Sequence, residues 1–369
     1  MKSYKYWLDR FVKHDLIDFT ITSEGLLWLK LRSIERRELL SSFVQDAKLD
    51  IDLSNKNRME EMWAALCENG KIKLALTTFM RKCQRLENEH INETFENIRS
   101  NLYRMSEFHW GGGFRNSLDK AIVTRYVKTD EIVPYERLES ICDGELRVMT
   151  HGYLLNSWYD YWSSVLIENV FRRQSGVMPA PGRIKNVDFF VDDVPFDLKV
   201  TYVPKEYAKK IRKELGIDDP VRRLKRFAKD YKIPFCKDAD EETIRYELEQ
   251  KIHDSQTAEG QTVLAAVKED WRKLVCHIKK QSYELVRWLY ENQGDMRFGA
   301  ENRIFLILTD MQEPRNSWKL KRNVDLITPA IQAWVSSFNR ANIEQKRISF
   351  LYNQTNYDAF ADVIFVCNE

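Results

Sequence analysis

Two aspartates and a lysine between residues 188 and 201 have the types and spacing of a metal site. Asp188 opens a run of alternating apolar and polar residues, and Asp197 and Lys199 follow later in the same run. Carboxylate oxygens are the ligands that Mg²⁺ prefers, and side chains two residues apart on a strand project from the same face. These residues therefore predict a site for a divalent cation, with Lys199 placed to orient or activate a water molecule.

The residues around these side chains predict a β-hairpin with one buried face. The apolar positions that alternate with polar or turn residues are Val187, Phe189, Val191, Val194, Phe196, Leu198 and Val200. With Asp192-Asp193 as the two-residue loop, counting outward from it sets Asp188 opposite Asp197. Cross-strand partners have Cβ atoms roughly 4.5–5.5 Å apart, where like charges are destabilising. We therefore expect a divalent cation to neutralise this pair.

Asp188 followed by Asp197-Leu198-Lys199 resembles the PD-(D/E)XK signature of the restriction-endonuclease-like nucleases. The sequence departs from that signature at Val187, where the family has proline. In the family an acidic residue on the preceding helix often completes the metal site, and Glu168 stands at the matching position. The resemblance therefore implies Mg²⁺, with Mn²⁺ as an alternative, held by Asp188, Asp197 and Glu168. It also implies that these three residues and Lys199 are catalytic.

Each of these assignments has a simpler alternative. The hairpin could be an ordinary exposed one whose polar face is acidic, although such a face would more often offer Lys, Thr or Glu opposite an aspartate. We favour the metal site because the preceding helix also supplies a carboxylate. For Glu168 alone, a solvated position on an amphipathic helix is equally consistent with the sequence.

The composition is that of a globular protein without a disulfide framework. Of the 369 residues, 43% are hydrophobic and 31% are charged, and the six scattered cysteines include no C-x-x-C pair. This pattern argues against a zinc ribbon and against a disulfide-stabilised secreted domain. The sequence shows no apolar signal region and no apolar run long enough to cross a bilayer. We therefore expect a cytoplasmic protein with no membrane partner.

Helical and strand patterns alternate along the second half of the chain. A helix is expected before the hairpin over residues 157–174, a long helix over 262–292, a strand buried on both faces over 303–309, and final strands over 347–352 and 361–367. We therefore predict an α/β fold over residues 153–369, a restriction-endonuclease-like mixed sheet flanked by helices. Residues 1–152 are predicted to form a helical N-terminal region.

A helical, basic insertion is expected after the hairpin, at about residues 203–255. The net charge of the chain is only +2, but lysine and arginine gather here and could neutralise backbone phosphates. The candidate nucleic-acid-binding residues are Arg222, Arg223, Lys225 and Arg226. Two short helical patterns around Ile233-Pro234-Phe235 resemble the helix-extension-helix of SAP-type DNA-binding modules. A solvated helical face and a plain helical hairpin are the alternatives.

These features favour a metal-dependent DNA endonuclease that hydrolyses phosphodiester bonds, with double-stranded DNA as its partner. The family resemblance allows a restriction or phage-defence nuclease and a homodimer. Two other classes stay open: a catalytically inactive DNA-binding or scaffold subunit with a nuclease-like fold, and an RNA-directed nuclease. The presence of both acids and the lysine argues against the inactive subunit. Nothing in the sequence resembles an RNA-recognition signature.

Overall fold

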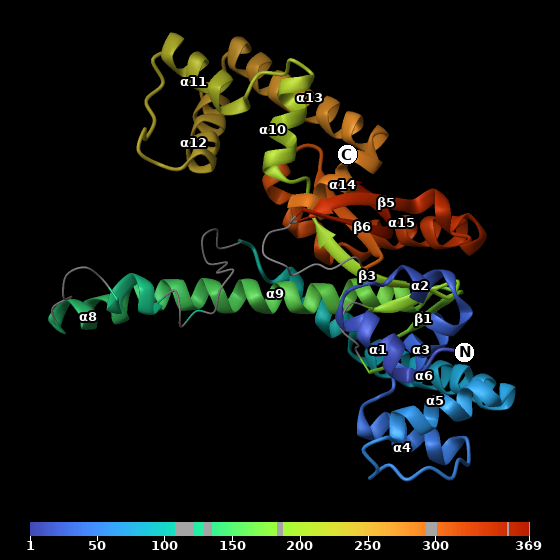
Figure 1. The fold of residues 1–369 in the computed structure, drawn as a ribbon. Coiled ribbons are helices and arrows are strands. Elements are labelled where there is room, and N and C mark those ends of the chain that lie inside the picture. The colour runs from blue at the N-terminus through green and yellow to red at the C-terminus, as the bar shows by residue number, and fades with distance from the viewer. Residues whose placement is uncertain are drawn as a thin grey trace.

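One mixed sheet of six strands organises the molecule, with helices on both of its faces (Figure 1). The structure is a computed structural model, and it describes residues 1–107, 118, 122–128, 135–182, 187–292, 301–352 and 354–368. The predicted α/β class and the mixed sheet flanked by helices are confirmed. None of the described helices is both long and apolar enough to span a membrane.

The strands follow the order β1-β2-β3-β4-β6-β5 across the sheet. They are β1 (Val177–Pro179), β2 (Phe189–Val191), β3 (Val194–Thr201), β4 (Arg303–Asp310), β5 (Arg347–Tyr352) and β6 (Thr355–Asn368). β3 and β4 pair in parallel, as do β4 and β6, whereas the other neighbours are antiparallel. The long crossover from β3 to β4 therefore carries a block of helices.

The predicted hairpin is confirmed in position, and its register is confirmed from the turn out to Phe189 and Phe196, but the ladder ends there and does not include the predicted pairing of Asp188 with Asp197. Val191 pairs with Val194 and Phe189 with Phe196, as the count from the turn requires. The turn residues Asp192 and Asp193 have φ of 46° and 64°, the left-handed backbone that a two-residue hairpin loop of type I′ needs.

One face of the sheet is covered by α9 (Arg147–Arg172) and α15 (Val324–Ser337). The inward side chains of the hairpin join this core, with Phe189, Phe196 and Leu198 at 0%, 1% and 8% exposure. These three were predicted to be buried on one face, and they are. α9 begins ten residues before the predicted helix, so the predicted boundary between residues 152 and 153 falls inside it.

The other face is covered by helices of the crossover. α10 (Lys205–Glu214), α13 (Ala258–Lys280) and α14 (Ser282–Asn292) pack against Phe305 and Ile307 of β4. Every residue of β4 is buried, as predicted for a strand covered on both faces. The single long helix predicted over residues 262–292 is instead two helices, because the backbone leaves the helical conformation at Gln281.

The rest of the crossover forms a unit with a small core of its own. α11 (Pro220–Asp230) and α12 (Glu241–Asp254) pack against α13 through side chains shared by the three helices. The residues of this core include Leu224, Phe227, Ile244, Leu248, Ile252 and Val267. The predicted basic insertion is therefore helical, and its core extends into α13, beyond the predicted limit at residue 255.

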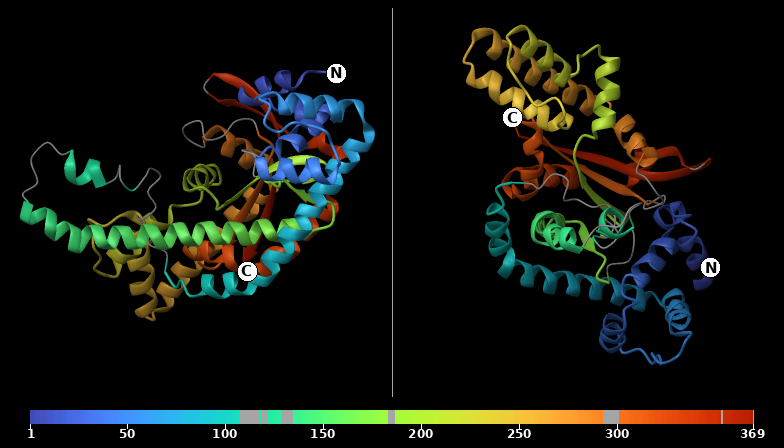
Figure 2. Two further views of the ribbon diagram at one scale, coloured as in Figure 1. Left: turned by 90° about the horizontal axis from the view of Figure 1, so that it is seen from below. Right: turned by 90° about the vertical axis from the view of Figure 1, so that its left-hand side faces the viewer.

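The N-terminal helices share a core with the hairpin. They are α1 (Tyr4–Val12), α2 (Ile17–Ile21), α3 (Ser23–Arg32), α4 (Arg37–Asp46), α5 (Arg58–Glu68) and α6 (Gly70–Tyr103). Val187 and Phe190 belong to the same hydrophobic cluster as Trp28 of α3. Lys30 Nζ also lies 2.6 Å from Asp193 Oδ1 at the hairpin turn. The N-terminal helices and the α10–α13 unit lie at opposite ends of the molecule, with the sheet between them (Figure 2).

Shorter helical segments complete the described chain. They are η1 (Val123–Val127), α8 (Tyr135–Ile141), η2 (Cys142–Leu146), η3 (Pro314–Arg322) and η4 (Arg340–Lys346).

Candidate active site

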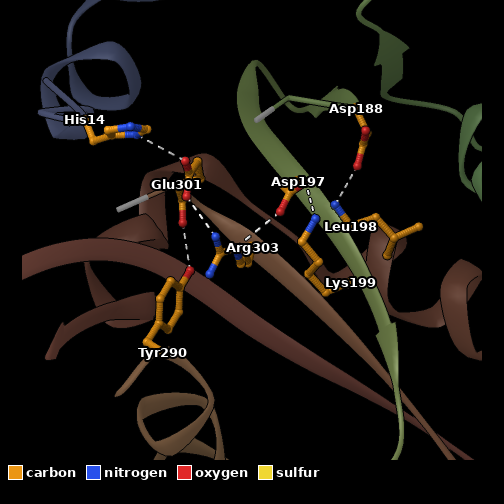
Figure 3. Close-up of polar contacts among 8 residues, drawn as sticks. All are labelled: His14, Asp188, Asp197, Leu198, Lys199, Tyr290, Glu301 and Arg303. Atoms are coloured by element: carbon orange, nitrogen blue, oxygen red, sulfur yellow. Dashed lines mark hydrogen bonds and ion pairs between the residues drawn. The ribbon is translucent and has the colours of Figure 1, made fainter. Parts of the chain in front are cut away.

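Asp188 lies where β2 diverges from β3 (Figure 3). The paired register ends at Phe189 and Phe196, and the Asp188 N–H donates to the Phe196 carbonyl at 2.9 Å. The carboxylate Oδ2 accepts the N–H of Leu198 at 2.8 Å. The side chain thus takes the place that a neighbouring strand's carbonyl would hold, and this contact fixes the carboxylate at the edge of β3.

The charge on Asp188 is poorly compensated. Its pKa is raised to about 6, first because the carboxyl is buried and then because the carboxylates of Asp197 and Glu168 repel it. The Leu198 N–H and the charge of Lys199 act in the opposite direction. Asp188 is therefore close enough to both other carboxylates for their charges to raise its pKa.

Asp197 is buried on β3 between two cationic side chains. Lys199 Nζ donates to Asp197 Oδ1 at 2.8 Å, and Arg303 Nε donates to Asp197 Oδ2 at 3.2 Å (Figure 3). Asp197 therefore already has two cationic partners within the protein, and a divalent cation as the neutralising partner of the aspartate pair stays a prediction. Arg303 reaches Asp197 because the parallel pairing of β3 with β4 sets the two residues directly opposite each other.

Glu168 is the predicted third acid. It lies on α9, which covers the face of the sheet opposite to the side chain of Asp197. Its Oε2 accepts Arg172 Nη2 at 3.1 Å, and Arg172 Nη1 lies 3.3 Å from Glu87 Oε2 of α6. Among the residues that the structure describes, no group of three or more His, Cys, Asp or Glu side chains is arranged to hold a metal ion. The role of Glu168 as a ligand stays a prediction.

The donor chemistry fits a hard divalent cation. Asp197 offers carboxylate oxygens from β3 and Asp188 from the residue before β2, and a cation between them would offset the repulsion that acts on Asp188. Lys199 is bonded to one of these acids, and a third of its side chain is exposed. The site therefore combines two potential ligands with a cationic group that reaches solvent.

The four predicted nucleic-acid-binding residues differ in exposure to solvent: two are exposed and two are partly buried. Arg222 and Arg226 are about two-thirds exposed, and both pair with Asp218. Arg223 lies 2.8 Å from Asp270 of α13 and is only 26% exposed, so its ion pair fastens α11 to α13. Lys225 is partly buried. Figure 1 places α11 at the outer end of the helical unit, away from the hairpin.

Arg303 was not foreseen as part of the site. The sequence indicates only that it lies on a buried strand, because its link to Asp197 depends on a strand pairing between residues that are far apart in the chain. A charged residue at the start of an otherwise apolar run was the one available signal.

The raised pKa of Asp188 predicts a pH-dependent stability. Because the folded protein holds this proton more tightly than the unfolded chain, the free energy of unfolding should fall as pH rises from about 4 to about 6. Asp188→Asn keeps an acceptor for Leu198 and removes the charge. In EDTA, urea unfolding should show the variant about 1–3 kcal/mol more stable at pH 7.5 and equal to the wild type at pH 4.

Asp193→Asn on the same hairpin is the matched control, and it should show no such gain in stability at pH 7.5. An Asp188→Asn variant whose stability relative to the wild type is the same at both pH values would contradict this account.

Comparison of the chain with protein-family models, with curated proteins and with solved structures gives no match. The functional assignment therefore rests on the chemistry of the site itself.

Proposed function

We propose that the chain is a divalent-metal-dependent nuclease that hydrolyses phosphodiester bonds in double-stranded DNA, with Asp188, Asp197 and Lys199 at its reactive centre. One observation carries the proposal. Asp188 lies at the point where a hairpin opens, and the facing strand presents Asp197 with the Lys199 ammonium bonded to it. Two carboxylates and an ammonium in this arrangement suit an anionic substrate whose charge must be neutralised during reaction.

The finer fold belongs to the same proposal. We infer the restriction-endonuclease-like type of α/β fold, and two features support it. A helix bearing Glu168 precedes the hairpin and packs on it, and a mixed sheet continues beyond the hairpin through parallel strands. Both features agree with what the short motif from Asp188 to Lys199 implies.

The proposed site would hold Mg²⁺ or Mn²⁺ through Asp188 and Asp197, with Glu168 as a further ligand if its carboxylate leaves Arg172. When bound, the cation would supply Lewis-acid stabilisation of charge on the scissile phosphate. The Leu198 N–H holds Asp188 Oδ2 in place, so that the orientation of this carboxylate does not depend on the cation. Lys199 would orient the attacking water or donate to a phosphate oxygen.

A cleavage assay tests this proposal. Duplex DNA, single-stranded DNA and RNA are incubated with Mg²⁺, Mn²⁺, Ca²⁺ or EDTA, and we expect cleavage of duplex DNA with Mg²⁺ or Mn²⁺ only. Asp188→Asn and Lys199→Ala should each lower the rate by about 10²-fold or more, because each removes a group that acts on the reacting atoms.

Asp193→Asn, at the turn of the same hairpin, is the control and should cleave like the wild type. Cleavage of RNA alone would favour an RNA-directed nuclease. A folded wild type that binds duplex DNA but cleaves nothing would favour an inactive DNA-binding subunit. Full activity in Asp188→Asn or Lys199→Ala would contradict the proposed site.

The proposed DNA contact of the helical unit predicts a change in salt dependence. Arg222 and Arg226 are the exposed arginines of α11, so Arg222→Gln with Arg226→Gln should weaken duplex binding. Loss of two phosphate contacts should reduce the slope of log K against log salt by about 1.8. Lys56→Gln with Lys71→Gln, at two exposed positions of the N-terminal helical region, is the matched control. An equal slope in the two double variants would mean that α11 is a solvated face.

A further inference from the structure

Asp197 is one link in a series of alternating charges that runs from the hairpin into the protein (Figure 3). The Asp197 carboxylate bonds outward to Lys199 and inward to Arg303. Arg303 Nη2 donates in turn to Glu301 Oε2 at 2.8 Å. Nδ1 of His14, from the N-terminal helical region, lies 3.4 Å from Glu301 Oε1.

The Arg303 guanidinium has little freedom to move. The side chain is 1% exposed, bridges the carboxylates of Asp197 and Glu301, and lies with its central carbon 4.9 Å from the ring centre of Tyr290. A planar guanidinium held at two edges and over one face can present its Nε in only one direction. Its hold on Asp197 therefore fixes the orientation of that carboxylate.

The backbone that carries Arg303 is also fixed from several sides. The Tyr290 hydroxyl donates to the Glu301 carbonyl at 2.7 Å, and the Asp197 N–H donates to the Asn302 carbonyl at 2.9 Å. The Asn302 amide donates to the Pro195 carbonyl at 3.0 Å and to Thr20 Oγ1 at 2.6 Å. The residues from 301 to 303 are thus bound to α14, to β3 and to the N-terminal helices.

Glu301 changes what Arg303 does to the charge of the site. Alone, the arginine would hold Asp197 and cancel its negative charge. Glu301, 2% exposed, forms a neutral pair with Arg303, so that Lys199 is the cation left to offset the charge of Asp197 while Arg303 fixes the orientation of the carboxylate. A buried ion pair of this kind is often no more stable than apolar residues of similar volume, so fold stability alone does not account for it.

We propose that Arg303 is the positioning residue for Asp197, and that Glu301 is the counter-charge that leaves Asp197 able to bind a divalent cation. This inference rests on the proposed nuclease function and names the residues that prepare its carboxylate. It also gives the N-terminal helices a part in the site, since His14 and Thr20 contact residues 301 and 302.

The test measures Mn²⁺ binding to the metal-free protein by calorimetry, together with urea unfolding and DNA cleavage at saturating Mn²⁺. Glu301→Gln keeps the shape of the side chain and leaves the charge of Arg303 facing Asp197. We expect roughly 10–100-fold weaker Mn²⁺ binding, the usual effect of losing a partner behind a metal ligand. Arg303→Lys, which keeps the charge but cannot bridge two carboxylates, should weaken binding by a similar factor.

The double variant Arg303→Met with Glu301→Leu separates positioning from folding, because it removes the pair without leaving a buried charge that lacks a partner. It should unfold at the same urea concentration as the wild type or higher, yet bind Mn²⁺ and cleave DNA less well. The matched control is Lys30→Met with Asp193→Asn, which removes the ion pair at the turn of the same hairpin. Its Mn²⁺ binding should equal that of the wild type.

The outcomes distinguish this inference from the function on which it rests. If the wild type neither binds Mn²⁺ nor cleaves DNA, both fail. If the wild type does both, and the folded double variant and Glu301→Gln bind Mn²⁺ as the wild type does, the positioning role is wrong while the nuclease proposal stands. Weaker Mn²⁺ binding in the control variant as well would likewise overturn the specific role of Arg303.

Discussion

The parallel pairing of β3 with β4 is the constraint on which the candidate site depends. It sets Arg303 opposite Asp197 and so adds a buried cation to the carboxylate that Lys199 of the same strand also contacts. The same pairing requires a crossover from one strand to the next, and that crossover supplies the helices that cover Arg303. The fold and the electrostatics of the site are therefore linked, because the crossover that joins β3 to β4 also helps to bury Arg303 and Glu301 beside Asp197.

The hairpin could be predicted from the sequence because all of its determinants are local. Alternation fixes which side chains face the core, and the two aspartates of the turn fix the register, since a slip of one residue would turn Phe189 and Phe196 to the other face. The class of fold followed from helices and strands that alternate along the second half of the chain. The divergence of β2 from β3 at Asp188 lay outside such reasoning, because pairing counts assume a continuous ladder.

The contacts that the sequence did not reveal join segments that are far apart in the chain. Arg303 compensates Asp197 across 106 residues of chain, and Arg223 pairs with Asp270 of α13 instead of facing outward. A count of charges within a short stretch of sequence around Asp197 or Arg223 includes neither of these partners. The N-terminal helices were treated as a separate region, yet Phe190 of the hairpin lies in their core. Apolar alternation shows that a face is buried, and it does not show which segment buries it.

A crystal structure of the protein soaked in Mn²⁺ would test the central claim most directly, through the anomalous scattering of the ion. The account predicts an anomalous peak in contact with carboxylate oxygens of both Asp188 and Asp197, with Arg303 still bonded to Asp197 and Glu301. A structure in which Mn²⁺ occupies other sites, while no peak lies between Asp188 and Asp197, would contradict it.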